Sequence, residues 1–190
     1  MNFLGHWLFS DPNQDALIGS LWPDFGKRPR PDLVSTTLLE HFDRHQFLDK
    51  FTDNSPTLEP VRVALRPGLR KTTPVVLDVL LDHHLARHWH RYHPEPLAEF
   101  AERRYALCEP LNVPGLPPRL GMMLERMSAD NWLVHYRTEV GISRALQGIA
   151  RRIRFANPIE QEIDNALAIG QGMEAELDRF LFEALAEIRD

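Results

Sequence analysis

The chain has 190 residues, the size of one domain, and its 43% apolar content is enough for a sizeable core. A net charge of -5 argues against a nucleic-acid binder held mainly by phosphate contacts, and the single Cys108 excludes a disulfide framework or a multi-cysteine metal site. The first residues lack the basic segment of a signal peptide, and no apolar run reaches the ~18 residues of a membrane span. We therefore expect a soluble cytoplasmic protein that binds neither nucleic acid nor membrane.

Capping residues placed directly before prolines predict four helix starts, at Asp11-Pro12, Ser55-Pro56, Thr73-Pro74 and Asn157-Pro158. No β-branched alternation indicates a sheet, so the predicted fold is all-α, a single bundle-like domain over residues 1–190. With the apolar periodicity, these starts predict helices at about 13–22, 32–52, 56–66, 74–92, 97–109, 119–127, 131–153 (which can break near Gly141) and 158–187, with a loop at 110–118.

Histidines are concentrated in the first half of the chain, where eight of the nine precede residue 94. The predicted helix that begins at Pro74 is apolar on most sides, which is typical of a buried helix, yet it carries Asp78 and Asp82 one turn apart and His83 beside them. Two buried carboxylates so close repel each other unless a cation lies between them. These residues are therefore candidate metal ligands. The structural alternative is that Arg87 and Arg91 form ion pairs with Asp82 or with neighbouring helices.

A second group of His and Asp residues lies in the segment HFDRHQFLDKFTDN. His45 and Asp49 are one helical turn apart and Asp53 follows by another turn, so all three share a helix face. Two further candidates are His6, in the apolar N-terminal segment, and Asp24, after Trp22-Pro23. The structural alternatives are a turn residue for Asp24 and a cap for Asp53. Together, mixed His and Asp ligands suit Mn²⁺, Fe²⁺, Zn²⁺ or Mg²⁺.

Several blocks of the sequence resemble the acyl carrier protein phosphodiesterase family, also called acyl carrier protein hydrolase. The blocks are MNFLGHW, GSLWPDF, His45 to Asn54, LDVLLDHHLARHW, NWLVHYR and Ala150 to Arg152, in order from Met1 to about Arg154. The resemblance implies a mostly helical fold distantly related to HD-type metal phosphohydrolases. It also implies hydrolysis of the phosphodiester between 4'-phosphopantetheine and a serine of acyl carrier protein, with a divalent cation, typically Mn²⁺.

Carried over by position, the resemblance implies that the recurrent His and Asp residues of the family are His6, Asp24, His45, Asp49, Asp53, Asp78, Asp82 and His83. We expect the metal to be held by Asp24, Asp78, Asp82, His83, Asp49 and Asp53, and the catalytic groups to be Asp24, His6, His45 and His83.

The sequence departs from the family pattern around His45, where the family usually has a histidine two positions earlier and arginines just after. Here these positions are Asp43, Gln46 and Phe47. We therefore expect other arginines to bind the substrate phosphate or the carrier, with Arg44, Arg87, Arg91, Arg151 and Arg152 as candidates. Two alternatives stay open: a metal phosphohydrolase of nucleotides or other small phosphodiesters, and a non-catalytic helical module that binds carrier protein.

The net charge is distributed unevenly along the chain. Residues 155–190 carry a net charge of -7, whereas residues 1–154 carry +2. We expect the first part to form the metal-binding catalytic body and the acidic C-terminal helix to pack on it. Nineteen of the 22 basic residues are arginines, and as a group they can attract an acidic partner such as acyl carrier protein.

Overall fold

A computed structural model describes residues 1–189, and within that range the chain forms helices and no β-strand, which confirms the all-α prediction. The helices are α1 (Phe3–Leu8), α2 (Gln14–Gly19), α3 (Thr36–Asn54), α4 (Glu59–Leu69), α5 (Thr73–Arg87), α6 (Leu97–Leu107), α7 (Pro118–Ala129), α8 (Trp132–His135), α9 (Glu139–Arg152), α10 (Ile159–Gly172) and α11 (Glu174–Arg189). Single 3₁₀ turns, η1 (Trp22–Asp24), η2 (Pro56–Leu58), η3 (Arg70–Thr72) and η4 (Trp89–Arg91), lie between them.

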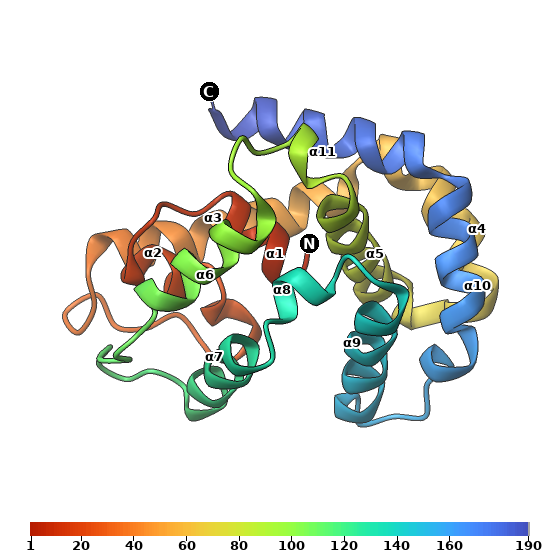
Figure 1. The fold of residues 1–190 in the computed structure, drawn as a ribbon. Helices are drawn as coiled ribbons and strands as arrows, with labels where there is room; N and C mark the ends of the chain where they lie inside the picture. The colour runs from red at the N-terminus through yellow and green to blue at the C-terminus, as the bar shows by residue number, and fades with distance from the viewer. Residues whose placement is uncertain (190) are drawn as a thin grey trace.

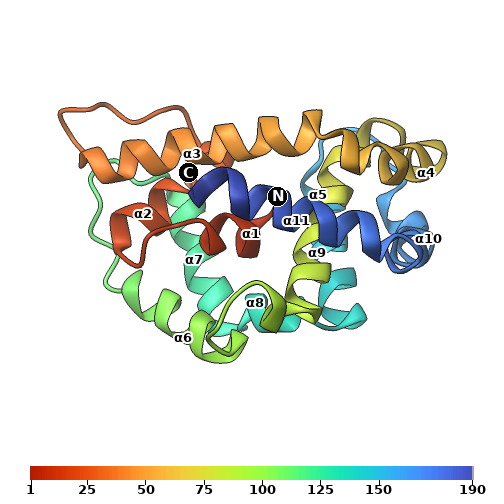
Figure 2. The ribbon, with the colours of Figure 1, turned by 90° about the horizontal axis from the view of Figure 1, so that it is seen from above.

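Helix α5 is the central element of the fold, because α1, α4, α9, α10 and α11 all pack against it. This explains why its sequence is apolar on most sides: Val76, Leu77 and Val79 point to different sides of the helix and are all buried. Figure 1 shows α11 crossing one end of the molecule, with α7 and α9 facing each other at the opposite end. Figure 2, seen from above, shows α1 between the long α3 on one side and α6 and α8 on the other.

The prediction of one C-terminal helix over 158–187 is wrong, because the chain forms α10 and α11 instead. The first of these ends at Gly172, and Met173 leaves the helical conformation with a ψ of 31°. Glycine is unfavourable in the interior of a helix, which explains why α10 ends here. The acidic residues Glu174 and Glu176 stabilise the positive N-terminal end of the next helix. None of the helices in the described chain has both the length and the apolar character that crossing a bilayer requires.

Capping residues also correct the predicted boundaries near the site. The helix predicted at 13–22 covers only α2, which is capped by Asn13 rather than Asp11: the Asn13 side chain accepts a hydrogen bond from the Ala16 N–H at 2.9 Å. The helix predicted at 131–153 is two helices, because Thr138 accepts from the Gly141 N–H at 3.0 Å and starts α9. The break therefore precedes Gly141, where a Cβ atom would lie only 2.0 Å from the His135 carbonyl oxygen.

The short helix α1 was not predicted, because its capping group is distant in sequence. Its N-cap residue, Asn2, makes no side-chain capping bond. Instead, the Asp82 carboxylate on α5 accepts hydrogen bonds from the Leu4 N–H at 2.7 Å and the Gly5 N–H at 3.0 Å. The contact between α5 and α1 thus supplies an acceptor for the N–H groups of the first turn, which have none within the helix itself.

Candidate metal-binding site

Four of the predicted site residues meet where α1, η1 and α3 come together: two expected metal ligands, Asp24 and Asp49, and two expected catalytic groups, His6 and His45. His6 comes from α1, Asp24 from η1, and His45 and Asp49 from one face of α3. The Nε2 atom of His45 lies 3.0 Å from Asp49 Oδ2 and 3.7 Å from Asp24 Oδ1, and His6 Nε2 lies 3.3 Å from Asp49 Oδ1. Donor atoms bound to one divalent cation are about 3 Å apart, so this spacing suits a metal ion.

Both histidines of this group are positioned to present Nε2. The Nδ1 of His45 lies 2.6 Å from the Ser20 carbonyl oxygen, a contact that places the proton of a neutral ring on Nδ1 and leaves the Nε2 lone pair free. The two imidazole rings stack with their centroids 3.8 Å apart. Neither ring nitrogen of the buried His6 makes a well-aligned hydrogen bond within residues 1–189. An unsatisfied buried imidazole next to a carboxylate is a donor set that fits a cation.

The pKa values of the site residues follow from burial and from the neighbouring charges. Burial, reinforced by the charge of His45, lowers the pKa of His6 to about 3, so His6 is neutral, as a metal ligand must be. Burial disfavours the charged form of Asp49 as well, but its close contacts with the ring nitrogens of His45 and His6 hold its pKa well below the usual range. Burial also opposes protonation of His45, yet the contact with Asp49 and the charge of Asp24 raise its pKa overall.

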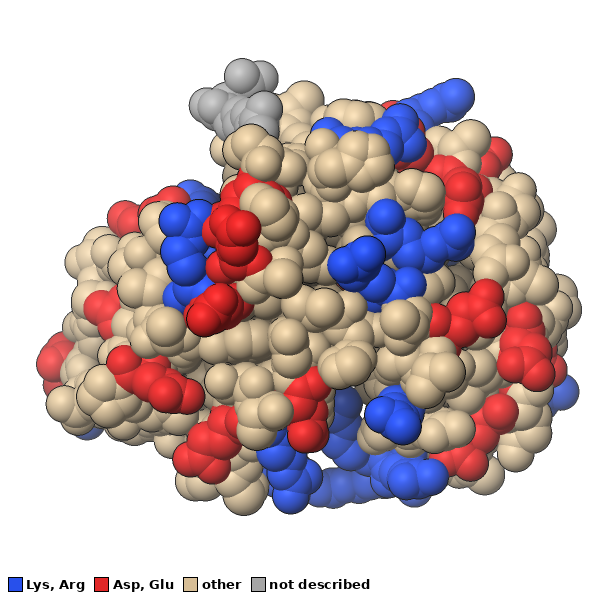
Figure 3. Space-filling view, viewed as in Figure 1, with Lys and Arg blue, Asp and Glu red and all other residues tan. Residues whose placement is uncertain are grey.

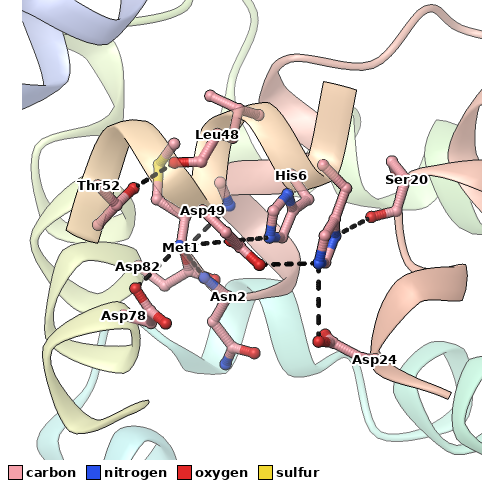
Figure 4. Close-up of polar contacts among 12 residues, drawn as sticks. Met1, Asn2, His6, Ser20, Asp24, Leu48, Asp49, Thr52, Asp78 and Asp82 are labelled. Atoms are coloured by element: carbon pink, nitrogen blue, oxygen red, sulfur yellow. Dashed lines mark hydrogen bonds and ion pairs between the residues drawn. The ribbon is translucent and has the colours of Figure 1, made fainter. Parts of the chain in front are cut away.

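Asp78 and Asp82 are adjacent to this group and already have partners in the chain. The α-amino group of Met1 donates a hydrogen bond to Asp78 Oδ1 at 2.9 Å and lies 3.4 Å from Asp49 Oδ1, as Figure 4 shows. The charges of these carboxylates raise the pKa of the amino group to about 10, although its burial opposes this. Burial raises the pKa of Asp82 to about 7 against the effect of the amino group and the α1 N–H groups. An ammonium group and a helix N-terminus thus neutralise this carboxylate pair.

Asp53 and His83 lie apart from the four-residue group. Asp53 is exposed on α3, and its side chain makes no hydrogen bond or ion pair within residues 1–189. His83 is buried, with its Nδ1 2.6 Å from the Tyr136 carbonyl oxygen, and its Nε2 has no partner in the described chain. The structure therefore brings together His6, Asp24, His45 and Asp49, with Asp78 beside them.

The five predicted anion-binding arginines have different surroundings. Arg87 pairs with Glu174 at 3.0 Å and Arg91 with Asp178 at 2.7 Å. Both arginines therefore form ion pairs with the neighbouring helix α11, and neither pairs with Asp82. Arg44 donates to the Phe9 carbonyl oxygen at 2.9 Å, and Arg151 lies 3.4 Å from Glu160. Arg152 makes no ion pair in the described part of the chain; its Nε donates to the Gly148 carbonyl oxygen at 3.2 Å.

The residues that depart from the family pattern lie on the outer side of α3. Asp43, Gln46 and Phe47 are exposed, whereas His45 and Asp49 face the site. Asp43 pairs with Arg28, and Phe47 stacks on Phe51 with ring centroids 6.1 Å apart. These positions therefore face solvent and not the metal-binding group.

A second His and carboxylate group joins α5 to α11. It contains His84, His88 and Glu174, whose donor atoms are close enough for a metal ion. The His84 Nε2 lies 3.1 Å from the Tyr92 hydroxyl, which donates to Asp178 at 2.5 Å. Because Arg87 and Arg91 already occupy the carboxylates, we interpret this group as a polar link between the two helices.

This link predicts a pH-dependent stability. Burial and the nearby His88 lower the pKa of His84 from 6.5 to about 4. Between these values the unfolded chain binds a proton that the folded chain does not, so stability falls as the pH decreases from 6.5 to 4. The expected loss is about 3 kcal/mol. In urea unfolding over this pH range, the free energy of unfolding should decrease less for His84→Asn than for the unmodified chain. The exposed His90→Asn is the control, and equal slopes for all three proteins would contradict the prediction.

Comparison with known proteins places the chain in a family. A model of the acyl carrier protein phosphodiesterase family matches residues 1–184. The chain therefore belongs to this family of phosphoric diester hydrolases, which confirms the resemblance of the sequence motifs.

Two relatives show the extent of the similarity. The acyl carrier protein phosphodiesterase of Enterobacter sp. (strain 638) is 35% identical over 154 residues, which cover 80% of this chain and 79% of the relative. The protein of that name from Escherichia coli O139:H28 (strain E24377A / ETEC) is 32% identical over 154 residues, with the same coverage. No solved structure matches the chain.

Proposed function

We propose that this protein hydrolyses the phosphodiester that joins 4'-phosphopantetheine to a serine of holo-acyl carrier protein. The products are the apo-carrier and free 4'-phosphopantetheine, and the reaction requires a divalent cation, most suitably Mn²⁺. The observation that carries the proposal is the group of His6, Asp24, His45 and Asp49, in a chain that belongs to the phosphodiesterase family. We infer that the reaction takes place in the cytoplasm, where the carrier acts.

The four residues of the group would hold the cation. A bound divalent cation polarises a phosphoryl oxygen and lowers the pKa of water that it binds. The imidazoles of His6 and His45 are fixed by burial and by the Ser20 carbonyl oxygen, so little reorganisation is needed for them to act as ligands. Asp78 is engaged by the α-amino group of Met1 and contributes negative charge beside the ligands.

Asp24 is the most accessible member of the group and is therefore the best placed to meet the substrate. Its side chain is 46% exposed, whereas that of His45 is 2% exposed. Its carboxylate can hold a proton at Oδ1 or Oδ2 at the edge of the site, next to the scissile ester. We propose that Asp24 completes the ligand set and also orients the phosphodiester or its attacking water.

Intact-mass analysis of holo-acyl carrier protein tests this function. With the protein and Mn²⁺, we expect the carrier to lose the mass of 4'-phosphopantetheine, and we expect EDTA to prevent the loss. If the carrier keeps its prosthetic group while bis(p-nitrophenyl) phosphate is cleaved, the substrate is a small phosphodiester instead. If neither compound is cleaved and the protein retains no metal, the chain is a binding module and the proposal is wrong.

A further inference from the structure

A large cavity lies between α7, α8 and α9, beside the candidate metal site. Its volume is about 1010 Å³, at the upper end of the range of small-molecule binding sites. Residues of all three helices line it, and two residues of the N-terminal segment, Asn2 and Phe3, complete its wall. The cavity is therefore large enough for an extended organic ligand.

The walls of this cavity carry an excess of positive charge. Arg126, Arg144 and Arg152 line it, and Asp130 is its one carboxylate. Within residues 1–189, no ion pair involves any of these three arginines, unlike Arg87 and Arg91. Figure 3 shows blue side chains gathered at the lower edge of the molecule, where α7 and α9 face each other. Unpaired guanidinium groups around one hollow favour an anionic partner.

Apolar groups lie between the arginines. Trp132, Val140 and Ile149 line the cavity, and Val140 is 63% exposed, so its apolar surface is open to a ligand. Asn131 adds an exposed side-chain amide that makes no hydrogen bond in the described chain. The cavity thus suits a chain with both apolar and amide groups, with negative charge nearby.

A row of contacts joins the cavity to the metal site. The ring of Phe3 stacks on Trp132, which lines the cavity, and on Phe25, which directly follows Asp24; both centroid distances are 6.4 Å. The Asn2 side chain donates a hydrogen bond to the Tyr136 hydroxyl in the cavity wall at 3.3 Å, and its backbone N–H lies 3.3 Å from Asp82. The first residues of the chain therefore form a wall common to both places.

We propose that this cavity binds the pantetheine arm of the holo-carrier substrate, an inference that rests on the proposed function. A phosphodiester at the metal site has two substituents, the carrier serine and the arm. The carrier is too large to enter a cavity, whereas the arm is a narrow chain of amide and apolar groups that matches this lining. Arg126, Arg144 and Arg152 are exposed, so they can attract an acidic carrier whose arm occupies the cavity.

Gly148 offers a direct test, because it lines the cavity and an added Cβ atom there would meet no atom within 4 Å. In Gly148→Phe the new ring fills part of the cavity while the core stays intact. The ratio of kcat/KM for holo-carrier to that for bis(p-nitrophenyl) phosphate should fall at least about 10-fold. Gly172→Phe is the matched control, since Gly172 lies at the end of α10, outside the cavity, and also has open space.

Charge reversal provides an independent variant. Arg144→Glu should raise KM for holo-carrier about 10-fold, whereas Arg119→Glu, an exposed arginine of α7 outside the cavity, should not. If the unmodified chain cleaves holo-carrier and Gly148→Phe cleaves it equally well, the cavity is not the subsite, although the proposed function holds. If the unmodified chain does not cleave holo-carrier at all, both the proposed function and this inference are wrong.

Discussion

Asp49→Asn is expected to reduce the Mn²⁺-dependent hydrolysis of holo-carrier at least about 100-fold and to lower the metal content of the purified protein. Asp49 is the residue that the two histidines of the group share, because one carboxylate oxygen faces His6 and the other faces His45. Its pKa lies well below the usual range, so at neutral pH it is a full negative charge beside the two imidazoles. An amide of the same size removes that charge and presents an N–H group to one of the histidines.

The control for this variant lies one turn further along α3. Asp53→Asn makes the same chemical change on an exposed side chain that is not part of the four-residue group. It should retain both the metal and the activity, as measured by inductively coupled plasma mass spectrometry and by intact-mass analysis of the carrier. Equal losses in the two variants, or normal metal binding by Asp49→Asn, would show that the metal is held elsewhere.

The second large effect concerns stability. Asp82→Asn should lower the free energy of unfolding by about 3 kcal/mol at pH 8, because an amide cannot accept hydrogen bonds at both of its terminal atoms. The Asp82 carboxylate accepts from the Leu4 N–H with one oxygen and from the Gly5 N–H with the other, and it is fully buried. In the variant, at least one donor of the first turn of α1 is left without a partner in the protein interior.

Urea unfolding followed by circular dichroism measures this loss, with Asp53→Asn again as the control. Excess Mn²⁺ should leave the difference between Asp82→Asn and the unmodified chain in place, because Asp82 stabilises a helix and is not expected to bind the cation. A difference below about 0.5 kcal/mol would mean that water satisfies the α1 donors and that the carboxylate has another role.

The helical fold could be predicted from the sequence, whereas the grouping of the candidate site residues in space could be predicted only in part. Helical periodicity and i,i+4 spacing were sufficient for α3, so His45 and Asp49 could be placed on one face before the structure was known. The same spacing grouped Asp78 with Asp82, but spacing on one helix does not reveal what faces it. The partners of these carboxylates, the Met1 amino group and the first turn of α1, are about 80 residues away in sequence.

Other features cannot be predicted from local patterns in the sequence. The α1 helix is six residues long, too short to be stable in isolation, and the carboxylate that accepts from its first N–H groups belongs to another helix. The cavity arginines Arg126 and Arg144 lie on helices with ordinary polar faces, and only the packing of α7 opposite α9 brings them together. The division into α10 and α11 did have a signal, the glycines at 170 and 172 before two glutamates, which the apolar periodicity concealed.

The cap on α1 has a consequence for how the protein opens. Because α1 carries His6 and is held by Asp82, its first turn cannot unwind without displacing His6, a candidate metal ligand, and leaving a buried carboxylate without its donors. Its N-terminal end also carries Phe3, which packs toward the cavity. Local unfolding of this segment would therefore disrupt the candidate ligand set, the cap of α1 and the cavity wall in one cooperative step.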